Sequence, residues 1–202
     1  WHRLGQALLA LGADANATDA AGLTALHYAA QLGRTVLLKE LLVAGGDPGR
    51  RAANGQTPFG LALRSGAREA QHWLDWPDWQ LPVRRLHGGD LSSAVSSKDH
   101  DAVKRLLSLA VPLDSLDGRG STALIHACGQ GQMALVQLLL SYGAQVNLPA
   151  ANGVTPLWAA ISQGHEDILQ TLLEHQADAN QAVAAFPPLI LASRSGRVDM
   201  VG

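Results

Sequence analysis

Cys128 is the single cysteine of the 202-residue chain and stands two residues after His126, an arrangement that invites comparison with a thiol nucleophile and its imidazole base. On a helix, side chains two residues apart point about 200° away from each other, so these two groups do not pair. Cys128 also falls at the helix position that Ala30, a small packing residue, has in an earlier segment. We therefore expect a buried, unreactive thiol and no catalytic residue.

The eight histidines and one glycine-rich segment are the other candidates for chemistry. Metal-binding sequences show paired His or Cys ligands at short fixed spacings, such as HExxH, and no such pair occurs in this sequence. The segment Asp117–Ser121 (DGRGS) resembles a phosphate loop only faintly, because the lysine and the preceding strand of that motif are missing. We expect no metal and no cofactor, and we interpret DGRGS as a turn.

The charged residues are balanced in number. Lys and Arg total 15 and Asp and Glu total 17, which gives a formal charge of -2. The doublets Arg50-Arg51 and Arg84-Arg85 are therefore interpreted as solvated surface. The pair Glu166-Asp167 falls in the first turn of a predicted helix, where the helix dipole stabilises acidic side chains. Neither nucleic acid nor a membrane is expected as a partner.

The composition is that of a folded domain. Apolar residues make up 47% of the chain and charged residues 16%, which excludes a mostly disordered protein. No apolar run reaches the ~18 residues of a membrane span, and no charged-then-apolar signal peptide opens the chain. A lone cysteine excludes an intrachain disulfide framework and suits a reducing compartment, so we expect a cytoplasmic location.

A repeat with a period of about 33 organises the chain. Five similar strings end at Gly33, Gly66, Gly131, Gly164 and Gly196, among them TALHYAAQLG and TPLWAAISQG. One interval, from Gly66 to Gly131, is twice as long as the others and so spans two periods. The missing string lies at positions 89–98, where Leu91 stands two periods after Leu26. A period of this length indicates stacked supersecondary units.

The sequence pattern of each repeat predicts two short helices and a turn. The first helix starts at a Thr-Pro pair, as at Thr57 and Thr155, which is a hydroxyl N-cap followed by proline. The glycine after this helix allows the left-handed conformation that ends it. A second helix follows with leucines at helical spacing. The short polar segment after it, which we call the finger, suits a turn or hairpin and ends in Gly22, Gly55, Gly120 or Gly153.

The repeat resembles the ankyrin repeat over essentially the whole chain. The family patterns T-P-L-H-x-A-A, G-H-x-E-I-V and G-A-D-x-N are matched at Thr24–His27, Gly164–Ile168 and Gly12–Asn16. This resemblance implies an all-α solenoid of stacked helix pairs with projecting fingers. It also implies partner binding on a concave face of fingers and first helices, and local hydrogen bonding by His27 and His165.

The period divides the chain into a partial unit 1–17, full units 18–50, 51–83, 84–115, 116–148 and 149–180, and a partial unit 181–202. Neither end resembles a polar capping repeat, so we expect a fragment of a longer array.

Before residue 90 the pattern is irregular, because Trp76-Pro77-Asp78-Trp79 replaces a finger and Gly88-Gly89-Asp90 replaces Thr-Pro. The spacing persists across this segment, so we expect one continuous stack in which Asp90 caps the helix. The alternative is two stacks that meet near residue 83, with a break within residues 76–90.

The resemblance assigns partner binding to the variable positions around the finger glycine and at the end of the first helix. By register these candidates are Leu23, Gln31, Leu32, Arg51, Asn54, Gln56, Arg64, Arg119, Ser121, Gln130, Asn152, Val154 and Gln163. Trp76 and Trp79 are further candidates, because tryptophan often lies at interface centres. Their alternative role is to fill the space that the irregular unit leaves. Trp73 is expected to border the core.

These observations predict a non-enzymatic scaffold that binds another protein, whose identity the sequence does not reveal. The alternative is a targeting or autoinhibitory arm of a larger enzyme or effector whose chemistry lies outside these residues. Fold alone does not decide between them, and the full-length reading frame would.

Overall fold

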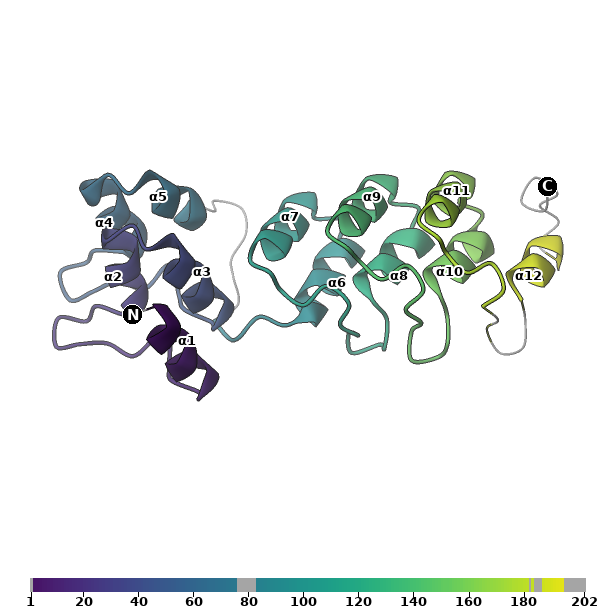
Figure 1. Ribbon diagram of the computed structural model, residues 1–202. Coiled ribbons are helices and arrows are strands. Elements are labelled where there is room, and N and C mark those ends of the chain that lie inside the picture. The colour runs from purple at the N-terminus through teal and green to yellow at the C-terminus, as the bar shows by residue number, and fades with distance from the viewer. Residues whose placement is uncertain (1, 76–82, 182, 184–186, 195–202) are drawn as a thin grey trace. The chain divides into compact units, whose positions relative to one another are not determined.

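The computed structural model describes residues 2–75, 83–181, 183 and 187–194, which form short helices joined by turns (Figure 1). In chain order the helices are α1 (His2–Ala10), α2 (Ala25–Gln31), α3 (Thr35–Val43), α4 (Pro58–Ser65), α5 (Arg68–Leu74), α6 (Gly88–Ser96), α7 (His100–Ser108), α8 (Ala123–Gly129), α9 (Met133–Ser141), α10 (Pro156–Gln163), α11 (Glu166–Glu174) and α12 (Pro188–Arg194). The predicted all-α repeat fold is confirmed. The chain divides into two compact units, unit 1 (residues 1–86) and unit 2 (residues 87–202). That one continuous stack runs through both units stays a prediction.

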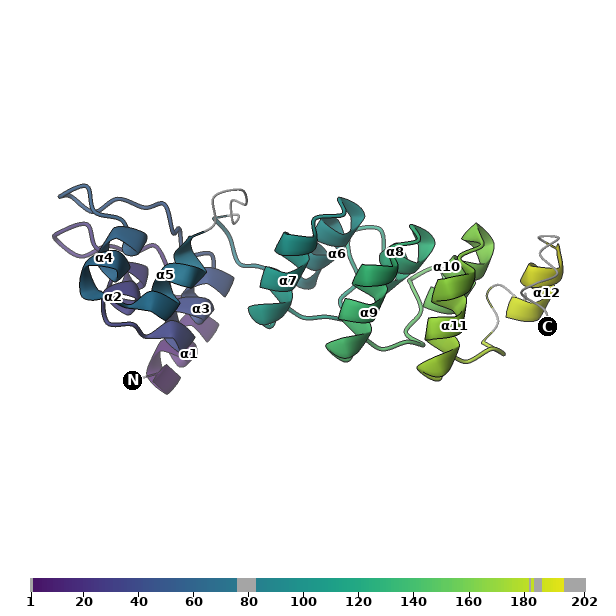
Figure 2. The same cartoon turned by 90° about the horizontal axis from the view of Figure 1, so that it is seen from above.

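Within each unit the helices form two rows (Figures 1 and 2). First helices of successive repeats pack on each other: α2 on α4 in unit 1, and α6, α8, α10 and α12 in order in unit 2. Second helices pack in the other row, α1 on α3 and α3 on α5 in unit 1, and α9 on α11 in unit 2. The core lies between the rows and includes the fully buried Leu26, Leu38, Leu106, Leu139 and Leu172.

Threonine is the N-cap of the first helices α2, α4, α8 and α10, which include the predicted caps Thr57 and Thr155. The hydroxyl oxygens of Thr57 and Thr155 accept hydrogen bonds from the backbone N–H groups of Gly60 and Trp158, each at 3.1 Å. Thr24 instead forms a capping box with His27, whose Nδ1 accepts from the Thr24 backbone N–H at 3.1 Å. These caps satisfy N–H groups that a helix start leaves without intrahelical partners.

Helix α6 starts earlier than the sequence indicated. Its N-cap is His87, and Asp90 is the third residue of the helix, so the prediction that Asp90 is the cap is wrong. The Oδ2 atom of Asp90 accepts a hydrogen bond from the backbone N–H of His87 at 2.9 Å. Gly88, the first residue of the helix, lies so close to Ser115 that a Cβ at this position would collide with the Ser115 side chain.

The glycines that end the helices have the left-handed conformation that the sequence predicted. Gly66, for example, ends α4 with a φ of 71°. Among the described residues, Lys98, Ala110 and Gln176 adopt a positive φ without being glycine, at 61°, 55° and 64°. All three stand where other repeats have glycine, and a Cβ makes this conformation costly.

Trp73 is buried in α5, as predicted, with 9% of its surface exposed. The Nζ atom of Lys39 in α3 lies 4.2 Å from the centroid of the Trp73 ring. This cation–π contact joins the second helices of two neighbouring repeats in unit 1.

Candidate functional site

Each described finger closes through the same backbone hydrogen bond. The N–H group at the start of the turn donates to the carbonyl four residues later, from Asp19 to Leu23 at 3.0 Å and from Asp117 to Ser121 at 2.9 Å. The same bond joins Ala52 to Gln56 at 2.9 Å and Ala150 to Val154 at 2.8 Å. An isolated antiparallel bridge also pairs Thr18 with Thr24. The fingers are therefore tight turns, and the interpretation of DGRGS as a turn is confirmed.

Side chains brace these turns in two ways. In one kind of finger an aspartate accepts two backbone N–H groups through its Oδ1 atom. Asp19 accepts those of Ala21 and Leu23, each at 2.9 Å. Asp117 accepts those of Arg119 and Ser121, also at 2.9 Å each.

The other kind of finger uses asparagine. The Oδ1 atom of Asn54 accepts the backbone N–H of Gln56, and that of Asn152 accepts the backbone N–H of Val154, both at 3.1 Å. In each unit an aspartate finger precedes an asparagine finger, and a backbone bond joins the two. Ala53 donates to the Ala21 carbonyl at 3.0 Å in unit 1, and Ala151 donates to the Gly120 carbonyl at 2.7 Å in unit 2.

Both aspartate fingers are tied to their own first helix. The Tyr28 hydroxyl donates to Asp19 Oδ2 at 2.6 Å, and the Nε2 atom of His126 lies 2.7 Å from Asp117 Oδ2. The Tyr28 hydrogen bond, followed by that of the Leu23 N–H, holds the pKa of Asp19 below its ordinary value. The same bond to Asp19 raises the pKa of Tyr28.

Sequence reasoning missed the role of Tyr28 and His126. The signal was present, because Asp19 and Asp117 stand three periods apart, and so do Tyr28 and His126. In both repeats a side chain that can form hydrogen bonds stands nine residues after the finger aspartate.

The predicted binding residues lie at the surface. Of the thirteen that the structure describes, nine are exposed: Gln31, Leu32, Arg51, Asn54, Arg64, Arg119, Gln130, Asn152 and Gln163. The other four, Leu23, Gln56, Ser121 and Val154, are half-buried and directly follow the finger glycine. We call the candidates of residues 23–64 the finger face of unit 1 and those of residues 119–163 the finger face of unit 2. Trp76 and Trp79 lie outside the described residues, so their role stays a prediction.

The predicted local hydrogen bonding by His27 is present. Its buried ring lies with Nδ1 2.9 Å from Thr24 Oγ1 and with Nε2 3.2 Å from the Gln56 carbonyl oxygen in the next finger. The ring thus connects the start of α2 to the adjacent repeat.

Cys128 and His126, the two side chains first considered for chemistry, have different surroundings. Cys128 is fully buried in α8, and burial raises the pKa of its thiol, whereas His126 is bound to Asp117. Among the described residues, no group of three His, Cys, Asp or Glu side chains is arranged to hold a metal ion. Within that part of the chain, no helix has the length and apolarity to cross a membrane.

Comparison with known proteins gives matches along most of the chain. Residues 2–74 and 91–183 match the family model described as Ankyrin repeats (3 copies). The 2-5A-dependent ribonuclease of Mus musculus is 53% identical over 58 residues, which cover 28% of this chain and 8% of that protein. The ARF GTPase-activating protein GIT1 of Homo sapiens is 44% identical over 78 residues, covering 38% of this chain and 10% of that protein. The B-cell lymphoma 3 protein homolog of Mus musculus is 33% identical over 130 residues, covering 61% and 29%. The chain therefore spans less than a third of each of these relatives.

Proposed function

The chain belongs to the ankyrin-repeat family, and we propose that it is a scaffold that binds a segment of another protein on its finger faces. The observation that carries this proposal is the combination of braced turns and exposed side chains. Backbone groups of the fingers are hydrogen-bonded within the turn, to Asp19 and Asp117 for example, while most variable side chains extend into solvent. A surface that is ordered before binding loses little conformational entropy when its partner arrives.

The charges of the candidates favour an acidic partner segment. Arg51, Arg64 and Arg119 are exposed, and the thirteen candidates within the described residues include no Asp or Glu. The finger face of unit 1 adds Leu32, which is 62% exposed. We therefore propose a partner segment with acidic side chains and one apolar anchor, in which the charges give specificity and on-rate and the anchor gives affinity.

A second candidate function is a targeting or autoinhibitory arm within a larger enzyme or effector. The similarity to a short part of a ribonuclease and of a GTPase-activating protein favours keeping this candidate. In that case the segment bound by the finger faces belongs to the same polypeptide. The complete reading frame separates the two candidates, since a catalytic signature beside the repeats supports an arm.

Charge reversal in the intact protein tests the proposal. A double variant Arg51→Glu/Arg64→Glu changes the finger face of unit 1, and Arg68→Glu/Lys104→Glu makes the same charge change on exposed positions of the second helices α5 and α7. In pull-downs with crosslinking, we expect the first variant to lose the partner and the control to keep it. Binding should also weaken with added salt. Equal capture by both variants would contradict a role of the finger face.

A further inference from the structure

Two asparagines are followed by glycine, and both lie in the asparagine fingers: Asn54-Gly55 in unit 1 and Asn152-Gly153 in unit 2. An asparagine before glycine can lose its amide group without an enzyme, because glycine has no side chain to keep its backbone nitrogen away from the amide carbon. Both asparagines are exposed. The other asparagines of the chain precede residues that have a side chain, and they are Asn16, Asn147 and Asn180.

The reaction is an internal displacement followed by hydrolysis. The backbone nitrogen of Gly55 attacks Cγ of Asn54, and the new N–Cγ bond closes a five-membered imide. The bond from Cγ to Nδ2 breaks, and ammonia leaves with the proton of the Gly55 N–H group. Water then opens the imide at Cγ to give aspartate, or at the backbone carbonyl to give isoaspartate, whose main chain runs through Cβ and Cγ. Gly153 and Asn152 react in the same way.

In the closed finger both reacting groups are hydrogen-bonded within the turn. The Gly55 N–H donates to the Ala52 carbonyl at 2.9 Å, and the Gly153 N–H donates to the Ala150 carbonyl at 2.8 Å. The Oδ1 atoms of the two asparagines accept backbone N–H groups at 3.1 Å. The imide therefore forms mainly from a finger that has opened, so the rate of the reaction reports how often each finger opens.

Side chains help to hold the asparagine finger of unit 1 closed. The Nη1 atom of Arg51 donates to the Gly55 carbonyl at 3.1 Å. The Nε2 atom of His27 in α2 lies 3.2 Å from the Gln56 carbonyl oxygen. The Nδ2 atom of Asn54 donates to the Gln56 side chain at 3.4 Å. Opening of this finger must break these contacts in addition to the backbone bonds of the turn.

The asparagine finger of unit 2 keeps the backbone bonds and differs in these side chains. Pro149, Ile125 and Val154 stand three periods after Arg51, His27 and Gln56. The side chains of proline, isoleucine and valine have no hydrogen-bond donor or acceptor. Alanine precedes the asparagine in both fingers, so the two sites share the tripeptide that reacts and differ in how their fingers are held.

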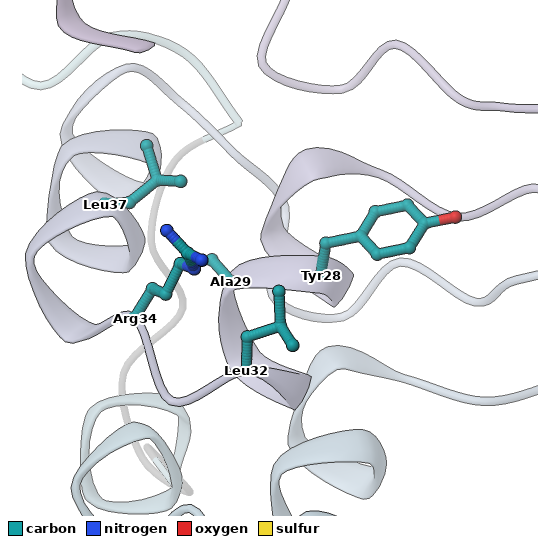
Figure 3. Close-up of a pocket in the computed structure, with 5 residues that line it drawn as sticks. All are labelled: Tyr28, Ala29, Leu32, Arg34 and Leu37. Carbon is teal, nitrogen blue, oxygen red and sulfur yellow. The ribbon is translucent and has the colours of Figure 1, made fainter. Parts of the chain in front are cut away.

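The aspartate fingers have a further bond, to their own first helix. Figure 3 shows the Tyr28 ring extending from α2 with its hydroxyl pointing away from Arg34, which lines a pocket of about 250 Å³ with it. That hydroxyl donates to Asp19. Leu61 and Ala159 occupy this position in the repeats with asparagine fingers, and their side chains cannot form such a bond.

We propose that Asn152 and, more slowly, Asn54 are sites of spontaneous deamidation, and that His27 and Arg51 protect Asn54. Each conversion adds one carboxylate to a finger face and needs only water. In the isoaspartate product the main chain also gains an atom, so the carboxylate no longer braces the turn as the asparagine Oδ1 does.

The added carboxylates oppose the binding of an acidic partner segment. Asn152 belongs to the same finger face as the exposed Arg119, and Asn54 belongs to the same face as Arg51. A converted finger repels acidic groups and offsets the charge of these arginines, so binding of the proposed partner should weaken. This consequence rests on the proposed function, whereas the deamidation itself does not.

Peptide mass spectrometry of the intact protein, incubated at neutral pH, measures the loss of amide at each asparagine. We expect Asn152 to convert about fivefold or more faster than Asn54, which is roughly the effect of one net hydrogen bond on an opening equilibrium. Asn16 and Asn147 are the internal controls, because both amides are bonded to the neighbouring repeat, and they should stay intact.

Unfolding the chain in guanidinium chloride removes the difference between the fingers. We expect Asn54 and Asn152 to convert at similar rates there, and faster than in the folded chain. Conversion of Asn54 as fast as that of Asn152 in the folded chain would overturn the proposal, and so would an Asn152 that stays intact.

Two variants test the protection of Asn54. His27→Ile gives unit 1 the residue that stands at the same position of unit 2, and Arg51→Ala removes the other contact at an exposed position that leaves the core unchanged. Each should quicken the conversion of Asn54, and Asn152 in the same chain should keep its rate. An unchanged rate at Asn54 in both variants would overturn the protective role.

Binding separates this proposal from the proposed function. Converted and unconverted chains, divided by ion exchange and identified by mass spectrometry, are compared in the pull-down with crosslinking. We expect the converted chains to capture less partner. Equal capture by converted chains would contradict the acidic partner and leave the deamidation sites established, whereas chains that do not convert would overturn the deamidation sites and leave the proposed partner unaffected.

Discussion

The Nε2 atom of His126 in α8 lies 2.7 Å from the Oδ2 atom of Asp117, so a first helix holds the finger that precedes it. Asp117 also closes the finger by accepting the N–H groups of Arg119 and Ser121. The variant Asp117→Asn keeps the size of the side chain and removes its charge. We expect it to lower the free energy of unfolding at pH 7 by about 1 kcal/mol, because partial solvent access limits the interaction. Urea unfolding followed by circular dichroism measures this change.

The pH dependence of this effect follows from the pKa of Asp117. Burial alone would raise that pKa, but the hydrogen bonds from Ser121, His126 and Arg119 together outweigh burial and hold it below its ordinary value. A carboxyl group of this kind adds stability above its unfolded pKa of about 3.9, and that stability is lost as the pH falls through the folded pKa. The difference between wild type and Asp117→Asn should therefore shrink below about pH 4. A difference that stays constant down to acid pH would contradict a stabilising role of the Asp117 carboxylate.

Replacing His27 separates its packing from its hydrogen bonds. Ile125 stands at the same position of a later repeat and is buried there, so an isoleucine fits this place in a first helix. The variant His27→Ile should keep the packing and lose the bonds of the ring to Thr24 and to the Gln56 carbonyl. We expect the free energy of unfolding to fall by about 1–2 kcal/mol.

The control for His27→Ile is Ile125→Val, which trims packing at the equivalent position and breaks no hydrogen bond. Hydrogen exchange of the Gln56 finger should quicken in His27→Ile alone. If the finger exchanges at the same rate in both variants, the ring does not join the two repeats.

The helix pairs could be predicted from the sequence because their determinants are local. A threonine cap such as Thr57 acts within its own first turn, and leucines such as Leu38 and Leu42 share a face through helical spacing. The start of α6 was mispredicted because an aspartate serves equally well as a cap or as the third residue of a capping box. In the structure Asp90 takes the second role, since it accepts the backbone N–H of His87, which is the N-cap.

The candidate site was predictable as a set of positions and not as a set of bonds. Each repeat has the same positions at the end of its first helix, so the register alone predicted that Arg64 and Gln163 lie at the surface, where the structure has them. The bond between Tyr28 and Asp19 is not apparent from one repeat alone, and only the shared nine-residue spacing of Asp19 with Tyr28 and of Asp117 with His126 indicates it. Likewise, the exposure of Leu4 and Leu8 depends on which helices pack against α1 and not on the sequence of α1 itself.

Glycine should stabilise the chain at three positions where a different residue has a positive φ. Lys98, Ala110 and Gln176 adopt φ values of 61°, 55° and 64°. A left-handed conformation costs a residue with a Cβ about 1–2 kcal/mol more than it costs glycine. We expect Lys98→Gly, Ala110→Gly and Gln176→Gly each to raise the free energy of unfolding by about 0.5–1 kcal/mol, after the larger entropy of glycine in the unfolded chain is subtracted. Urea midpoints of the three single variants provide the measurement.

The reverse change gives the matched control for these variants. Gly66 has a φ of 71°, and a Cβ built on it has no heavy atom within 4 Å. Gly66→Ala therefore isolates the backbone cost, and it should destabilise the chain by about 1 kcal/mol. Should Gly66→Ala prove neutral, the gain expected at Lys98, Ala110 and Gln176 has no basis.

The thiol of Cys128 should report the opening of unit 2. It is fully buried in α8, burial raises the pKa of the thiol, and it is the single cysteine of the chain. Because the thiolate is the reactive form, an aromatic disulfide reagent reacts with Cys128 only when unit 2 opens. We expect a rate of modification about a hundredfold or more below that of the chain unfolded in urea.

Two core variants separate the units. Leu139→Ala removes packing in α9, which contacts α8, and should increase the rate at which Cys128 reacts. Leu41→Ala in α3 changes the core of unit 1 instead and is the matched control. If the native chain reacts as fast as an exposed thiol, Cys128 does not occupy the buried packing position of the stack.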